Sequence, residues 1–111
     1  MNVYDTVNKL AEEIKTSQEY INFKKARQVI NSNEEYKNKI AEFEKIRYEE
    51  QINSIQNGKT DESKISQIQE LYKSLIEIDD IRKYFDAELK FNVLLGDVNK
   101  TISDAVKDVI S

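Results

Sequence analysis

The sequence predicts an all-α protein, an antiparallel helical hairpin or bundle with short N-terminal helices and a long C-terminal helix. The 111 residues include no Pro and only two Gly, so few residues interrupt a helix. Apolar residues recur at three- and four-residue steps along nearly the whole chain, which is the spacing of one helix face. The length suits one modest core, so we expect a single helical domain over residues 1–111.

The first two expected helices are short. The first ends near Ile14, where Ser17 offers an N-cap, because its hydroxyl can accept a hydrogen bond from a free backbone N–H. The second reaches Ile30 and is followed by a polar break at residues 31–33. Asn33 is a suitable N-cap for the next helix. The apolar stripes carry Val3, Val7, Leu10, Ala11 and Ile14, then Tyr20, Phe23, Ala26, Arg27 and Ile30.

The third expected helix covers about residues 34–56. Its second half, residues 48–57, is polar, and a helix that loses its apolar stripe either projects into solvent or packs on a partner chain. Gly58 is expected to end it, because Gly adopts the left-handed conformation without a Cβ clash. Residues 58–61 form the one convincing loop, with Thr60 or Asp61 as the next N-cap. One helix face carries Tyr36, Ile40, Phe43, Arg47 and Glu50.

Two more helices are expected, over about residues 62–76 and 80–108, with Asp79 as the cap of the last. A helix of ~28 residues extends ~42 Å, whereas a compact domain of this size is ~30 Å across. We therefore expect the last helix to protrude or to meet another chain. Gly96, within it, favours close approach of another helix. The stripes are Ile65, Ile68, Leu71, Tyr72 and Leu75, then Ile81, Tyr84, Phe85, Glu88, Leu95, Val98, Ile102, Ala105, Val106 and Val109.

Composition excludes several kinds of active site. Without Cys or His, the chain lacks the ligands of the usual zinc sites, a thiol nucleophile and the His-dependent triads. No stretch resembles G-x-S-x-G, a P-loop or G-x-G-x-x-G. We expect no enzymatic activity, no cofactor and no small-molecule substrate. No apolar run suits a membrane span, and the first residues lack a secretory pattern, so a cytoplasmic protein without membrane contact is expected.

Carboxylates are the remaining candidates for metal binding. Glu49, Glu50 and Glu88 could in principle hold a hard cation. The familiar di-metal helical bundle uses Glu-x-x-His pairs, and this chain has no His. A carboxylate-based metal-binding bundle is therefore kept as an alternative, with no metal ligand assigned.

A weak basic patch, Lys24, Lys25 and Arg27, is the candidate contact for RNA. The formal net charge is -4 and is evenly spread, which disfavours nucleic acid as a direct ligand. A solvated helix face is the favoured interpretation of the patch, given the overall acidity of the chain. An RNA-contacting accessory protein remains the second alternative.

Two charged residues stand on otherwise apolar helix faces. Arg47 is in register with Ile40 and Phe43, and Glu88 with Phe85. A buried charge is costly unless it is paired, so we predict a structural ion pair between Arg47 and Glu88. Arg82 or Arg27 could replace Arg47. The competing interpretation puts both charges at the stripe edge, extended toward water.

The last helix is apolar on nearly all sides between residues 84 and 95. A monomer would expose too large an apolar surface there, so we predict burial against a second copy. The expected partners are the chain itself, as a homodimer, and other proteins. The residues predicted for self-association are Ala87, Phe91, Leu94 and Leu95.

Three stretches carry packing motifs in a familiar order. Ser17 to Tyr20 forms a Ser-x-x-Tyr step between two helices within residues 3–30. Residues 31–51 are a polar break and then a helix with Phe and Gln. In residues 81–106 an acidic residue precedes an aromatic residue by three positions, and Asp-Val-x-x-x-Ile follows. Together the stretches resemble the YlbF/YmcA family of small helical bacterial proteins, and most closely its YheA-like branch.

The resemblance implies a role for the chain. Members of the YlbF/YmcA family are small all-helical proteins that associate with one another. They act as non-enzymatic regulators of competence, sporulation and biofilm formation, in a complex that guides RNase Y in mRNA maturation. Some bind an Fe–S cluster through Cys residues, which this sequence lacks, so cluster binding is not carried over. We expect a non-enzymatic interaction or regulatory adaptor.

Overall fold

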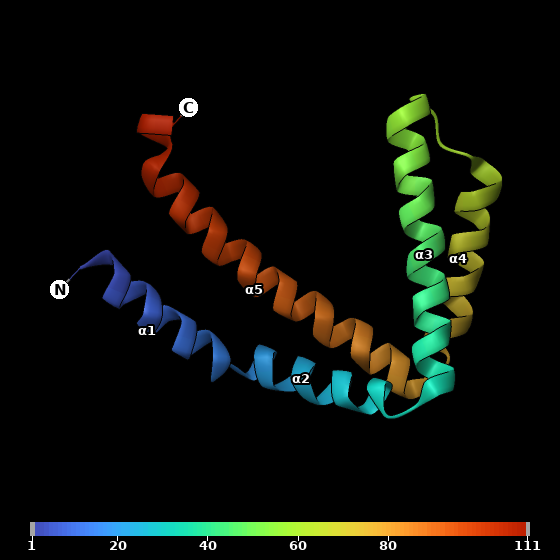
Figure 1. Cartoon of the computed structure of the whole chain (residues 1–111), viewed down its shortest axis with the longest axis horizontal. Helices are drawn as coiled ribbons and strands as arrows, with labels where there is room; N and C mark the ends of the chain where they lie inside the picture. The colour runs from blue at the N-terminus through green and yellow to red at the C-terminus, as the bar shows by residue number, and fades with distance from the viewer. Residues whose placement is uncertain (1, 111) are drawn as a thin grey trace. The chain divides into compact units, whose positions relative to one another are not determined.

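The computed structural model describes residues 2–110, which form five α-helices and no strand (Figure 1). This confirms the predicted all-α fold class. None of these helices is both long enough and apolar enough to cross a membrane. The helices are α1 (Val3–Lys15), α2 (Gln18–Asn31), α3 (Glu34–Asn57), α4 (Glu62–Ile76) and α5 (Asp79–Ile110).

Polar side chains begin the helices where the sequence predicts them. The Ser17 hydroxyl accepts a hydrogen bond from the Tyr20 N–H at 3.2 Å. Asn33 Oδ1 accepts one from the Tyr36 N–H at 3.1 Å. Of the two candidates for α4, Asp61 is the N-cap, and its carboxylate accepts from the backbone N–H groups of the first turn. These bonds satisfy donors that a helix start leaves without intrahelical partners.

Two predictions about helix ends have opposite outcomes. Gly58 ends α3 in the left-handed conformation, with φ 68°, as expected. Asp79 does not cap α5, because it is the first residue of that helix. Its carboxylate instead pairs with the side chains of Arg82 and Lys83, one turn further on.

The helical residues divide into two compact units. The hairpin unit comprises Gln28–Lys83, and the terminal unit comprises the residues up to Arg27 with those from Tyr84 onward. In the hairpin unit α3 and α4 lie side by side (Figure 1). The expectation of a single domain over residues 1–111 stays a prediction. The buried apolar side chains of the hairpin unit are Ile30, Ile40, Phe43, Leu75 and Ile81.

The second half of α3 is covered more than its polar sequence suggests. Glu50 is only 5% exposed, and residues 52–54 are half-buried. Part of this half therefore packs within the chain's own hairpin, through a polar contact with the loop before α4. The sequence suggested that this half either projects into solvent or packs on a partner chain. Packing against the loop of the same hairpin is a third arrangement, which the sequence pattern did not indicate.

The long C-terminal helix exceeds its predicted length. α5 has 32 residues and so extends about 48 Å. Gly96 lies within it, and a Cβ placed there would meet nothing within 4 Å. The predicted close approach of another helix at Gly96 is therefore wrong within the described chain.

Candidate interaction surfaces

An aromatic cluster joins α2 to α5 in the terminal unit. The Phe91 ring lies 5.6 Å from that of Phe23 and 5.9 Å from that of Tyr20, between ring centroids. Phe23 also lies 5.7 Å from Tyr84. Such separations suit tilted and edge-to-face aromatic pairs. Helical spacing positions these rings, since 20 and 23 share one face of α2, as 84 and 91 share one face of α5.

The residues predicted for self-association are therefore partly used inside the terminal unit. Ala87 is only 7% exposed, and Phe91 packs against the α2 rings. Leu94 and Leu95 are half-buried. Self-association through these four residues stays a prediction, with Leu94 and Leu95 retaining more accessible surface than Ala87.

Other apolar side chains of α5 remain exposed. Leu89 is 62% exposed and Val93 53%, one turn apart on the same helix face. Ile102 and Val106 repeat this spacing further along α5. The apolar positions predicted for this helix included Ile102 and Val106 but not Leu89 and Val93. The four-residue spacing of Leu89 and Val93 could have indicated that they share a helix face. The two pairs are 13 positions apart, which turns them about 140° around the helix axis, so they mark two different faces of α5. Single exposed apolar residues are common, whereas pairs one turn apart suggest contact surfaces.

Helix α1 has the same character. Val3, Tyr4 and Val7 are exposed, and none of its 13 residues is buried. Isolated helices of this length are marginal in water, because helix nucleation is costly and most helical stability comes from packing of the apolar face. α1 therefore presents an apolar face that a packing partner would stabilise.

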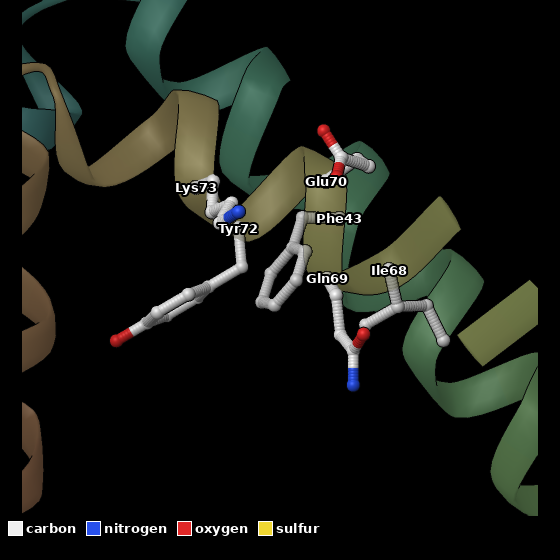
Figure 2. A pocket seen from close by; sticks show the side chains of 6 residues that line it. All are labelled: Phe43, Ile68, Gln69, Glu70, Tyr72 and Lys73. Carbon is white, nitrogen blue, oxygen red and sulfur yellow. The ribbon is translucent and has the colours of Figure 1, made fainter. Parts of the chain in front are cut away.

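The hairpin unit has an open hollow of about 470 Å³ (Figure 2). The Phe43 and Tyr72 rings lie there with centroids 5.9 Å apart. The Arg47 guanidinium lies 5.3 Å from the Phe43 ring centroid, a cation–π distance. No sequence signal indicated the hollow, because it forms only when α3 packs on α4. Its lining residues are Phe43, Ile68, Gln69, Glu70, Tyr72 and Lys73.

The predicted ion pair and basic patch have different surroundings. Arg47 belongs to the hairpin unit and Glu88 to the terminal unit, so their pairing stays a prediction. Arg47 is an exposed residue, and its guanidinium lies over the Phe43 ring. The patch of Lys24, Lys25 and Arg27 is exposed on α2. RNA binding by this patch also stays a prediction.

Glu50 is the buried carboxylate of the hairpin unit. It accepts a hydrogen bond from the Asp61 backbone N–H at 2.8 Å. The Asn53 amide donates to it at 3.3 Å and the Ser54 hydroxyl at 3.4 Å. We call Glu50, Asn53, Ser54 and Asp61 the Glu50 clasp. Within residues 2–110 no three acidic side chains gather in a metal-binding arrangement, and Glu50 is occupied by this network.

Two aspartates at the starts of helices have lowered pKa values. Hydrogen bonds from the Ser63 hydroxyl and then the Lys64 N–H hold the pKa of Asp61 below its ordinary value. The ammonium group of Lys83, and then Arg82, lowers the pKa of Asp79. Both carboxylates are exposed, so these shifts describe helix-start electrostatics rather than a catalytic site.

Curated bacterial relatives match almost the whole chain. A UPF0342 protein of Halothermothrix orenii is 37% identical over 103 residues, covering 92% of this chain and 86% of its own length. A UPF0342 protein of Symbiobacterium thermophilum is 36% identical over 104 residues, covering 94% and 93%. One from Caldicellulosiruptor bescii is 30% identical over 106 residues, covering 96% and 89%.

The fold is also similar to a solved structure. Bacillus subtilis RicA, crystallised in complex with RicF, matches with a TM-score of 0.62 at 20% identity, over 98% of this chain and 96% of that one. At this identity the likeness concerns the fold. The sequence model of the family described as control of competence regulator ComK, YlbF/YmcA, matches residues 3–107. Because this family model matches nearly the whole chain, in agreement with the order of the packing motifs, the chain belongs to the YlbF/YmcA family.

Proposed function

We propose that this protein is a non-enzymatic regulatory adaptor that acts through contacts between helices. The observation that carries the proposal is the set of large apolar side chains left exposed on α1 and α5, including Val3 and Val7 on α1 and Leu89 and Val93 on α5. Chemistry at a pocket would need converging nucleophiles, bases or ligands, whereas the described residues present exposed apolar side chains and helix-start carboxylates. The YlbF/YmcA family supports a regulatory role.

The first partner we propose is a second copy of the chain. Closed homodimers are the commonest protein assemblies, and a two-fold interface presents the same surface from both copies. The solved relative, RicA, was crystallised with RicF, which supports protein–protein association as the function of this fold. We also propose that the protein binds other proteins and is located in the cytoplasm. The processes proposed for its control are RNase Y-dependent mRNA processing, competence, sporulation or biofilm formation.

Light scattering of the purified protein tests self-association. We expect a mass near twice the 13.0 kDa of the chain at micromolar concentration. Val93→Asp, which places a charge on an exposed apolar site, should lower this mass while leaving helical circular dichroism intact. Asn99→Asp, at an exposed polar position on the same helix, is the matched control.

A pull-down tests the adaptor role. Tagged protein expressed in its native host should retain specific proteins that the Val93→Asp variant fails to retain. Identical partner lists for the two forms, or a mass of about 13 kDa in light scattering, would contradict the proposal. Salt-sensitive binding of RNA through Lys24, Lys25 and Arg27 would favour the RNA-contacting alternative instead.

A further inference from the structure

The end of α3 presents a chemically reactive dipeptide. Asn57 is the last residue of α3, and Gly58 follows it with φ 68°. Both residues are exposed. Gly58 has no side chain to shield its backbone nitrogen, and a Cβ built there would meet nothing within 4 Å. The Asn57 side-chain amide and the Gly58 nitrogen thus lie at an open surface in the order that permits cyclisation.

We propose that Asn57 is a site of spontaneous deamidation controlled by the Glu50 clasp. The deprotonated Gly58 nitrogen attacks Cγ of Asn57, a new C–N bond forms, and the side-chain nitrogen leaves as ammonia. Water then opens the resulting succinimide at either carbonyl, which yields aspartate or isoaspartate. Water is the only co-reactant, and no group is oxidised or reduced.

Two hydrogen bonds of the folded helix end retard this reaction. The Gly58 N–H donates to the Ser54 carbonyl at 2.9 Å, and the Asn57 amide donates to Asn53 Oδ1 at 2.5 Å. Both must break before the Gly58 nitrogen can reach Cγ. The reaction therefore proceeds from a frayed helix end, whose population depends on local stability.

The Glu50 clasp sets that local stability. Asn53, which accepts the bond from Asn57, donates its own amide to Glu50 at 3.3 Å. Ser54, whose carbonyl accepts from Gly58, donates its hydroxyl to Glu50 at 3.4 Å. Glu50 also holds the following loop through the Asp61 N–H. The buried carboxylate thus restrains both residues that protect the Asn57–Gly58 bond.

Deamidation would in turn loosen the hairpin. It adds a negative charge at the C-terminus of α3, where the helix dipole disfavours one. Isoaspartate also lengthens the backbone at the turn between α3 and α4. The modified turn is expected to lose part of the hydrogen bonding at the helix end.

Peptide mapping by mass spectrometry tests the site. The full-length protein is incubated at neutral and at mildly alkaline pH, and deamidated peptides and isoaspartate are quantified over time. Asn57 should convert faster at alkaline pH, because the attacking group is the deprotonated amide. Asn53, followed by Ser54 inside α3, is the internal control and should convert far more slowly. Conversion at Asn57 no faster than at Asn53 overturns the site.

Variants of the clasp test the control of the reaction. Glu50→Ala should accelerate conversion of Asn57 at least about fivefold, the factor that corresponds to about 1 kcal/mol for one hydrogen bond. Ser54→Ala, which removes only the hydroxyl contact, should accelerate it less, and it serves if Glu50→Ala fails to fold. Glu49→Ala is the exposed control and should leave the rate unchanged. Equal rates in Ser54→Ala and the natural chain overturn the role of the clasp.

Discussion

At the scale of single residues, Glu50 shows how a charged side chain can stabilise a turn from inside a hairpin. A buried carboxylate is costly unless hydrogen-bond donors surround it. Here the Asp61 N–H, the Asn53 amide and the Ser54 hydroxyl supply donors. The Asp61 N–H precedes α4, so the contact ties the loop back to α3.

Removing this carboxylate should destabilise the fold. Glu50→Ala removes the acceptor of the Asp61 N–H, and a hydrogen bond to a charged group contributes about 1.5–3 kcal/mol. Urea unfolding followed by circular dichroism measures the loss. Glu49→Ala, at the exposed neighbouring position, should change the free energy of unfolding by no more than about 0.5 kcal/mol. Equal midpoints for both variants would show that the clasp contributes little.

The start of α4 should make stability depend on pH. Because hydrogen bonds lower the pKa of Asp61 in the folded chain below its ordinary 3.8, the ionised form favours folding. This contribution is present above the unfolded pKa and is lost as pH falls through the folded pKa. Asp61→Asn keeps a capping side chain but removes the charge. The thermal midpoint of that variant should therefore fall less steeply below pH 3.8 than that of the natural chain.

At the scale of elements, α5 divides its apolar residues between two uses. Ala87 and Phe91 pack within the terminal unit, whereas Leu89, Val93 and Ile102 stay exposed. This division explains why the sequence shows apolar residues on nearly all sides of the helix. One face packs on α2 of the same chain, and the exposed apolar residues are available to a partner.

A pair of variants separates these two uses. Phe91→Ala removes two ring contacts, so it should lower the free energy of unfolding by roughly 1–3 kcal/mol. Ile102→Ala, at an exposed site, should leave the stability of the dissociated chain within about 0.5 kcal/mol. Denaturant unfolding at low protein concentration makes the comparison. The opposite ranking would mean that the aromatic cluster contributes less than the exposed stripe.

At the scale of the whole molecule, self-association should make stability depend on concentration. A partner that binds only the folded chain stabilises it by mass action, so a homodimer unfolds at a higher temperature when it is more concentrated. We expect the thermal midpoint to rise between micromolar and millimolar protein. The Val93→Asp variant should show a smaller rise. A midpoint independent of concentration for the natural chain would contradict the homodimer.

Much of the architecture was predictable because helix ends are encoded locally. Ser17, Asn33 and Asp61 begin helices through bonds to N–H groups two or three residues away, and Gly58 ends one through its own backbone conformation. Such signals depend on neighbours in sequence, so the sequence alone reveals them. Asp79 was the exception, because it lies inside the first turn of α5 and its carboxylate pairs with Arg82 and Lys83.

The candidate surfaces were less predictable, because helical spacing shows which residues share a face but not which element covers it. The sequence by itself determined five helices in order, their breaks and the family-like motif spacing. Only the tertiary structure decided that Phe91 packs on α2 while Val93 stays exposed, and that Glu50 holds the loop before α4. These contacts join residues far apart along the chain, and their energies exist only once packing has brought the helices together.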